Sequence, residues 1–299
     1  MPTATEIGDS AGSSRNNHLS AQRPMLRTRI RSAMLFGPIA ILIVLPGGWW
    51  TLVGMFAVAC WAAFEFSRLM SQGGHRPSLA FLVAVEAVFF LDAAWPVGQA
   101  LQPALLAVML VTISIQLFRK DLTQPTVDWA LSLAGGVYFG WLLVHFVYVR
   151  QLPGGLAWIL SALLVTWACD SGAYFVGRAI GRHKLYPRLS PGKTWEGIAG
   201  GVGGGLLAGA LVGCLSEHFL GSIGLLPGVA LGLMVSIVSP IGDLVISMMK
   251  REVGAKDSGS VIPGHGGVLD RTDSLLFVVT ATFYLATWLQ SGVQLNWPW

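Results

Sequence analysis

The chain alternates between long apolar runs and short polar links. The apolar runs approach the ~20 residues that an α-helix needs to cross a bilayer. They lack the alternation of apolar and polar positions that is typical of a membrane β-barrel. The pattern therefore predicts an all-α fold, a polytopic membrane helical bundle with about nine transmembrane helices. The predicted spans cover residues 33–46, 48–67, 79–96, 100–118, 127–149, 155–180, 195–215, 224–249 and 273–291.

The composition supports a membrane protein. Hydrophobic residues make up 54% of the 299 residues and charged residues 11%, which is too apolar for a typical soluble domain. The cysteines form no Cys-x-x-Cys pair and no even framework, which argues against a zinc site or a disulfide scaffold. They are Cys60, Cys169 and Cys214.

The two ends of the chain differ from its centre. Residues 1–32 are polar and then basic, and we expect a disordered basic N-terminal segment there. A cleaved signal peptide is the competing interpretation, although no small-residue cleavage site follows the first apolar run. No linker is long enough to separate two domains, so we expect a single integral-membrane domain over residues 33–293. Residues 294–299 form a short C-terminal tail.

Positive charge falls on alternate polar links. If the N-terminus is cytoplasmic, every lysine and arginine except Arg150 lies in the N-terminal segment or in the links after even-numbered spans. The positive-inside rule therefore predicts this orientation. The charged links over residues 178–196 and 250–273 would then share the cytoplasmic face. The net charge of +4 favours anionic lipid headgroups and nucleotides as partners.

The last charged link combines acids, bases and glycines. Asp243, Ser247 and Lys250 lie at i, i+4 and i+7, so they share one face of the eighth predicted span. A carboxylate about two turns inside the end of a span is a functional candidate, with a structural Asp243–Lys250 pair as the alternative. Residues 263–267 read Pro-Gly-His-Gly-Gly, a turn whose backbone N–H groups could cradle phosphate or simply reverse the chain.

Two acids, Asp270 and Asp273, open the ninth predicted span. Helix capping and complementarity to the helix dipole would explain them. Carboxylate oxygens of this kind also hold Mg²⁺ together with substrate phosphates. The neighbouring bases Arg251, Lys256 and Arg271 suit a phosphate partner.

A second polar cluster joins the sixth and seventh predicted spans. Residues 190–197 contain Gly-Lys-Thr, but Pro187 stands where a P-loop needs its first glycine and no strand is predicted before it. Thr194 is instead predicted to cap the next helix, with Glu196 in its first turn. Lys193 could meet a phosphate at that helix N-terminus, and a snorkelling lysine is the alternative. Ahead of this link, one helical face carries Asp170, Tyr174, Gly177 and Arg178.

Glycines recur every four residues along the seventh predicted span. This small-xxx-small stripe predicts close packing against neighbouring helices. A dinucleotide fingerprint is disfavoured because no βαβ unit surrounds it. The stripe consists of Gly197, Gly201, Gly205 and Gly209.

Three blocks resemble the phosphatidate cytidylyltransferase family, whose members are also called CDP-diacylglycerol synthases. The most specific block, residues 247–273, fits Ser-x-x-Lys-Arg, four residues, Lys-Asp, and then His-Gly-Gly-x-x-Asp-Arg-x-Asp. The others read Asp-x-x-Ala-Tyr-x-x-Gly-Arg from Asp170 and Ser-Pro-x-Lys-Thr-x-Glu-Gly from Ser190. The blocks fall within residues 167–273, and the N-terminal half shares only a general hydrophobic pattern.

The resemblance implies an integral membrane enzyme. We expect it in the bacterial inner membrane, and the charge pattern predicts that its active site faces the cytoplasm. It would transfer CMP from CTP to phosphatidic acid, giving CDP-diacylglycerol and pyrophosphate for phospholipid biosynthesis, with Mg²⁺ as cofactor. Asp243, Lys250 and Asp270 are the expected catalytic residues, and Asp243 and Asp270 the expected metal ligands. Asp170, Glu196 and Asp273 are further metal candidates. The expected substrate-binding residues are Ser190, Lys193, Thr194, Ser247, Arg251, Lys256, His265, Gly266, Gly267 and Arg271.

The concentration of charge fits a reaction between two polyanions. Cations would neutralise the repulsion between the substrates, and an anionic lipid phosphate needs no strong general base. Alternatives are a cytidylyltransferase or CTP-dependent kinase acting on another lipid, or a membrane transporter. A transporter is disfavoured because its acids would lie near the midplane rather than at one face. The expected partners are CTP, phosphatidic acid and the bilayer, with no nucleic acid; a homodimer is left open.

Overall fold

Long helices dominate the part of the chain that the computed structural model describes, residues 38–96, 98–220, 223–259 and 267–291. Several predictions lie outside these ranges: the basic N-terminal segment, part of the first apolar run and the C-terminal tail. His265 and Gly266 lie outside them too.

The apolar runs form helices close to their predicted limits. A helical segment at residues 38–44 precedes the labelled elements. These are α2 (Gly48–Gln72), α3 (Leu79–Ala94), α4 (Leu101–Ile115), the short η1 (Gln116–Phe118), α5 (Pro125–Gln151), α6 (Gly155–Ile180), β1 (Lys184–Tyr186), β2 (Ser190–Thr194), α7 (Trp195–Leu220), α8 (Leu225–Glu252) and α9 (Leu269–Gln290).

The membrane helical class is confirmed. Within the described residues, seven helical stretches are long and apolar enough to cross a membrane, with α4 and η1 counted as one. The α3 helix has 16 residues and falls short of that length, and the first predicted span is only partly described. The total of nine crossings therefore stays a prediction.

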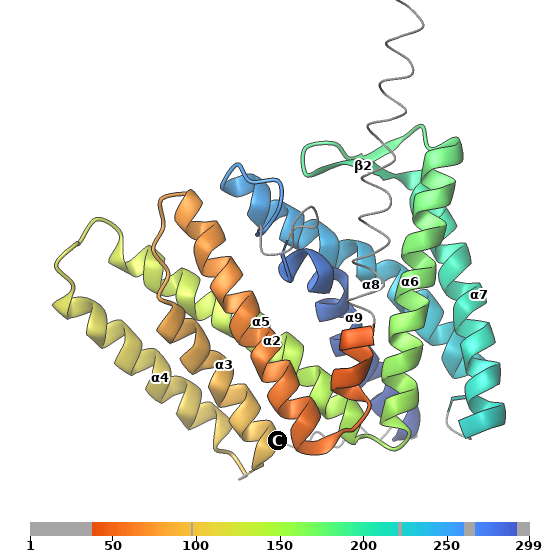
Figure 1. The fold of residues 1–299 in the computed structure, drawn as a ribbon, viewed down its shortest axis with the longest axis horizontal. Helices are drawn as coiled ribbons and strands as arrows, with labels where there is room; N and C mark the ends of the chain where they lie inside the picture. The colour runs from red at the N-terminus through yellow and green to blue at the C-terminus, as the bar shows by residue number, and fades with distance from the viewer. Residues whose placement is uncertain (1–37, 97, 221–222, 260–266, 292–299) are drawn as a thin grey trace, which may run out of the picture.

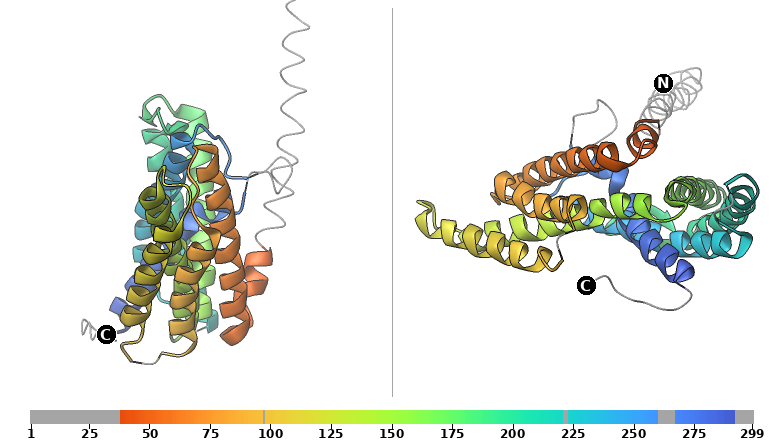
Figure 2. Two further views of the ribbon diagram at one scale, coloured as in Figure 1. Left: turned by 90° about the vertical axis from the view of Figure 1, so that its left-hand side faces the viewer. Right: turned by 90° about the horizontal axis from the view of Figure 1, so that it is seen from below.

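The helices form two groups joined by α9. In Figure 1, α2, α3, α4 and α5 lie on one side and α6 and α7 on the other, with α8 crossing behind. The α9 helix packs against α8, α5 and α6, and so joins the groups together with a direct contact between α5 and α6. Seen along the helices in Figure 2, the bundle is elongated rather than round, so much of its apolar surface lies at the periphery.

Glycines let α7 approach both of its neighbours. A methyl group on Gly200 would collide with Val176 of α6, and one on Gly209 would lie 3.0 Å from the Cα of Gly232 in α8 while overlapping the carbonyl oxygen of Gly228. Helix backbones can come this close only where side chains are missing. The predicted packing role is confirmed for the whole stripe, because Gly197 and Gly201 face α6 whereas Gly205 and Gly209 face α8.

The polar links after α2, α4, α6 and α8 gather at one end of the bundle, here called the hairpin end. Gln124 Nε2 donates to the carbonyl of Gly74 at 2.8 Å, which joins the links after α4 and α2. Arg251 Nε donates to the carbonyl of Leu189 at 3.3 Å, which joins the end of α8 to the link after α6. Val253 packs against the C-terminus of α2. These contacts place the cation-rich links on one face, as predicted.

Arg150 lies at the opposite end and has a structural role there. Its Nε donates to Val44 O at 3.0 Å and its Nη2 to Leu45 O at 3.1 Å. Gly47, in the turn before α2, has φ of 76°, and a side chain at that position would press on the Arg150 guanidinium at 2.9 Å. The one basic residue outside the predicted pattern therefore fastens a turn by satisfying free carbonyl groups.

The link between α6 and α7 contains an antiparallel hairpin of β1 and β2. Lys184 pairs with Thr194 and Tyr186 with Ser190, with an irregularity between the pairs. The sequence predicts this link only as a loop. β1 and β2 have only three and five residues, and β2 contains proline and glycine, so neither shows the alternation that identifies a strand.

Candidate active site

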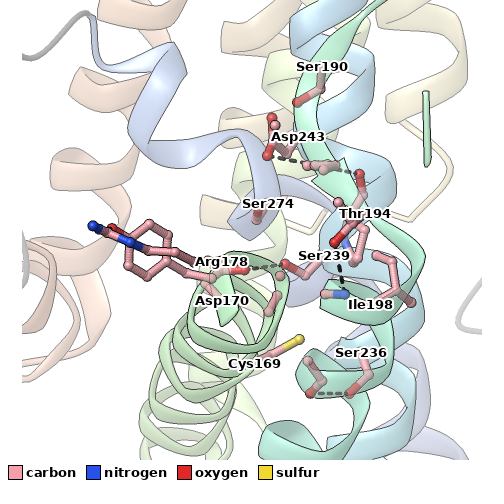
Figure 3. Close-up of a pocket in the computed structure, with 18 residues that line it drawn as sticks. Cys169, Asp170, Arg178, Ser190, Thr194, Ile198, Ser236, Ser239, Asp243 and Ser274 are labelled. Atoms are coloured by element: carbon pink, nitrogen blue, oxygen red, sulfur yellow. Dashed lines mark hydrogen bonds and ion pairs between the residues drawn. The ribbon is translucent and has the colours of Figure 1, made fainter. Parts of the chain in front are cut away.

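A pocket of about 870 Å³ opens at the hairpin end (Figure 3). Its walls come from α6, β2, α7 and α8, with one residue from the first turns of α9. It therefore brings together segments separated by about a hundred residues. The lining residues are Cys169, Asp170, Ala173, Tyr174, Gly177, Arg178, Ser190, Gly192, Lys193, Thr194, Gly197, Ile198, Gly201, Ser236, Ser239, Pro240, Asp243 and Ser274.

The predicted polar face of α6 lines one wall. Asp170, Tyr174, Gly177 and Arg178 all border the pocket, as their shared helical face implies. Arg178 Nη1 donates to the Tyr174 hydroxyl at 2.8 Å, and both side chains are exposed. This wall therefore offers a carboxylate within the pocket and a cation at its rim.

Two acids from different helices enter the pocket. Asp170 Oδ1 accepts a hydrogen bond from Ser239 Oγ of α8 at 3.2 Å. Asp243, labelled in Figure 3, lies one turn further along α8. Its Oδ1 accepts a hydrogen bond from Ser247 Oγ at 3.1 Å. Ser239 and Ser247, one turn before and one turn after Asp243 on α8, thus bind Asp170 and Asp243 respectively. The sequence did not predict a role for Ser239.

Lys193 of β2 reaches into the pocket. Its Nζ lies 2.8 Å from Asp243 Oδ2 and donates to the carbonyl of Pro240 at 3.2 Å. The side chains of Lys193 and Asp243 are 21% and 37% exposed, so the pair is accessible from the pocket. The lysine therefore faces α8 instead of snorkelling outward, and Asp243 pairs with Lys193 instead of Lys250.

The start of α7 is capped as the sequence predicts. Thr194 is buried, and its Oγ1 accepts the backbone N–H of Gly197 at 3.1 Å. Glu196 lies in the first turn but turns toward the base of the hairpin, where its Oε1 is 2.6 Å from His183 Nδ1. It is not among the residues that line the pocket.

Asp270 belongs to a separate cluster beside the pocket, at the junction of α8 and α9. Lys250 Nζ lies 2.5 Å from Asp270 Oδ1, and the two side chains are 12% and 13% exposed. Asp270 Oδ2 accepts the N–H and the hydroxyl of Ser258, both at 2.9 Å, and the N–H of Gly267 at 3.0 Å. The carboxylate is therefore saturated with donors, as expected for an acid that fixes a loop.

The acids within electrostatic reach of one another are Asp170, Asp243 and Asp273. They come from α6, α8 and α9. A methyl group on Gly242 would lie 2.5 Å from Asp273 O, so α8 and α9 nearly touch at this level. Asp273 precedes the lining residue Ser274 and interacts electrostatically with both pocket acids. The assignment of metal ligands to Asp243 and Asp270 stays a prediction.

The remaining predicted binding residues lie around these clusters. Ser247 is buried against Asp243, and Arg251 is exposed and also donates to Ala255 O at 2.9 Å. Lys256 is exposed, and Arg271 is half-buried in the first turn of α9. The structure therefore places these basic groups at the hairpin end without setting them in the wall of the pocket.

The chain is similar to known proteins along most of its length. Residues 27–289 match the model of the cytidylyltransferase family. The chain belongs to this family. Among its relatives are phosphatidate cytidylyltransferases from Bacillus subtilis, at 33% identity over 87% of this chain and 97% of the relative, and from Pseudomonas aeruginosa, at 37% over 88% and 99%. A Synechocystis phosphatidate cytidylyltransferase is 32% identical over 87% of this chain and 96% of its own length.

Family membership extends the similarity beyond the motifs. The match begins before α2 and ends in α9, so it includes the N-terminal helices that the sequence motifs leave out. This cytidylyltransferase-family chain is an integral membrane protein whose candidate pocket lies at the hairpin end.

Proposed function

We propose that this chain transfers CMP from CTP to phosphatidic acid, which yields CDP-diacylglycerol and pyrophosphate. The proposal follows the names of relatives that match nearly the whole chain. The structural observation that carries it is the pocket in which Asp170, Lys193 and Asp243 meet. A pocket at the end of a membrane bundle suits a reaction between a soluble nucleotide and a lipid anchored in the bilayer.

The reaction joins two phosphates. An oxygen of the lipid phosphate attacks the α-phosphorus of CTP, a new P–O bond forms, and the bond from the α-phosphorus to the bridging oxygen breaks to release pyrophosphate. Lys193 at the pocket wall supplies positive charge where the triphosphate would lie. The nucleophile is already anionic, so the pocket needs to orient and neutralise its substrates more than it needs to remove a proton.

Mg²⁺ is the proposed cofactor, and the chemistry of the pocket suits it. Asp170, Asp243 and Asp273 offer hard oxygen donors, and Lys193 is the cation paired with Asp243. No group of three metal-binding side chains among the described residues is close enough to form a ready-made site. When bound, the ion would neutralise phosphate charge, with Asp243 as the central ligand and Asp170, Asp273 or Asp270 completing the set.

We place the hairpin end on the cytoplasmic side of the inner membrane. Every lysine and arginine except Arg150 belongs to the N-terminal segment or to links assigned to that side. CTP is a cytoplasmic nucleotide, so this orientation also brings the pocket to its substrate.

A direct assay tests the proposed reaction. Purified protein is incubated with CTP and phosphatidic acid in detergent micelles, with and without Mg²⁺, and lipid and nucleotide products are quantified. Equal amounts of CDP-diacylglycerol and pyrophosphate are expected, and only with Mg²⁺. Release of CDP would instead indicate phosphate transfer, and Mg²⁺-independent turnover would remove the cofactor assignment.

A further inference from the structure

Glu65 is a buried carboxylate outside the motifs. It lies on α2, is 2% exposed, and reaches the start of α9, about two hundred residues away in the chain. Its Oε1 accepts the N–H of Val268 at 2.9 Å and its Oε2 the N–H of Leu269 at 3.0 Å. Trp61 Nε1, one turn earlier on α2, donates to Oε1 at 3.1 Å and so fixes the carboxylate.

These hydrogen bonds cap α9 from another helix. The first backbone N–H groups of a helix have no partner within it, and the positive end of the helix dipole favours an anion there. Val268, the N-cap residue of α9, makes no side-chain capping hydrogen bond within the described part of the chain. Glu65 supplies both the acceptors and the charge, and thereby sets where α9 begins.

Ser258 connects this cap to Asp270. Ser258 is 2% exposed, and its hydroxyl lies 3.3 Å from Glu65 Oε2 and 2.9 Å from Asp270 Oδ2. The hydroxyl has a single proton and can donate to only one acid at a time, whereas the Ser258 N–H stays on Asp270. A side chain at Gly267 would overlap both Glu65 Oε2 and the Ser258 hydroxyl, so glycine is needed for this approach.

We propose that Glu65 is a positioning residue for the cytidylyl transfer, which holds Asp270 and its partner Lys250 in place through Ser258 and the N-terminus of α9. The inference rests on the proposed function. Glu65 contacts the segment on both sides of residues 260–266, at Ser258 and at Val268. It also connects α2 to the junction of α8 and α9.

The position of Glu65 predicts which kinetic constant changes. The pocket is lined from α6, β2, α7 and α8, apart from Ser274, and none of its lining residues bonds to Glu65. Loss of the cap should therefore spare the binding of CTP and displace the Lys250–Asp270 pair. We expect a fall in kcat with little change in the KM for CTP.

The test is Glu65→Gln in the full-length protein, with Glu86→Gln as the matched control. Glu86 is also a buried glutamate of the N-terminal helices, 0% exposed, but its carboxylate oxygens have no hydrogen-bond partner among the described residues. In the Glu65→Gln variant an NH2 group replaces one of the two acceptor oxygens, so one of the two backbone N–H groups at the start of α9 loses its acceptor. We expect kcat to fall at least about 10-fold, with the KM for CTP within about 3-fold and faster hydrogen exchange at residues 253–259 and 267–270. Glu86→Gln should leave all three near wild type.

A second variant covers the case in which Glu65→Gln does not fold. Trp61→Phe removes one donor from Glu65 at a half-exposed position and should lower kcat about 2- to 5-fold with unchanged KM. An unchanged kcat in whichever variant folds would overturn the inference, as would an equal loss in Glu86→Gln. If the wild-type protein did not convert CTP and phosphatidic acid, the proposed function would fail, and unchanged exchange in Glu65→Gln would then show separately that Glu65 holds nothing in place.

Discussion

A carboxylate at a helix start can stabilise the fold or serve the reaction, and Asp270 is arranged to do both. Its oxygens accept three hydrogen bonds from Ser258 and Gly267 and pair with the nearly buried Lys250. The sequence identified Asp270 and Lys250 as important by residue type and motif. It could not pair them, since it placed Lys250 on one face with Asp243, and only the antiparallel packing of α8 on α9 brings Lys250 to Asp270.

Asp270→Asn tests the role of the charge at this position. The amide keeps the size of the side chain but loses the charge that balances Lys250, so we expect turnover to fall about 100-fold or more. The protein should still insert in the membrane, because its apolar helices are unchanged. Asp121→Asn is the control, as this exposed acid pairs with Arg76 far from the pocket. Steady-state CDP-diacylglycerol formation measures both variants, and near-normal turnover in Asp270→Asn would remove the acid from the catalytic set.

Two lysines at the hairpin end differ in burial and in partners, so a comparison of their variants tests whether position or net charge matters. Lys250 is 12% exposed and contacts Asp270, whereas Lys184 is exposed on β1. Lys250→Ala leaves Asp270 without its cation and should lower kcat about 100-fold. Lys184→Ala should stay within about 2-fold, since an exposed charge is screened by water and salt. Equal losses in the two variants would mean that the net positive charge of this end matters more than the position of either lysine.

At the scale of elements, apolar run length predicts helices well and short polar structure poorly. The predicted runs 155–180 and 79–96 correspond to α6 (Gly155–Ile180) and α3 (Leu79–Ala94), because a bilayer-length apolar run has few other ways to satisfy its backbone. The hairpin of β1 and β2 was not predicted. Its two strands are held partly by contacts to α8 through Lys193 and Arg251, which no local pattern encodes.

Replacement of glycine by alanine in α7 is expected to destabilise the protein on one face of the helix and to stabilise it on another. Alanine at Gly209 would overlap the carbonyl of Gly228 and push α8 away, which should cost about 1–3 kcal/mol of unfolding free energy. Gly203 has nothing within 4 Å of a new methyl group, so alanine there should stabilise the helix by up to about 1 kcal/mol. Thermal unfolding in detergent compares Gly209→Ala with Gly203→Ala. A drop of the same size in both variants would show that close packing at Gly209 does not explain the need for glycine there.

For the whole molecule, the sequence predicted the polar segments of the site but not the hydrogen bonds that join them to α2. Motifs in the second half predicted residues 170–178, 190–197 and 247–273, and the structure brings the described residues of these three blocks to the hairpin end. Glu65 escaped prediction because it is a single acid in an apolar run, and its partners Val268 and Leu269 are identified only by tertiary packing. An isolated carboxylate in a membrane span was the one available signal.

The arrangement of charge over the molecule predicts its orientation in the membrane. Gln151 lies at the end of α5 opposite the hairpin and Lys184 lies in β1, with α6 alone between them. After replacement of Cys60, Cys169 and Cys214 by alanine, a single cysteine at residue 151 should react with an impermeant maleimide in right-side-out vesicles. A single cysteine at residue 184 should react only in inverted ones. The reason is that links rich in lysine and arginine stay on the cytoplasmic side of the membrane. Arg150 is the exception, and its guanidinium donates hydrogen bonds to the carbonyls of Val44 and Leu45. The reverse labelling would place the pocket outside, away from CTP, and labelling of both positions from one side would mean that α6 does not cross the bilayer.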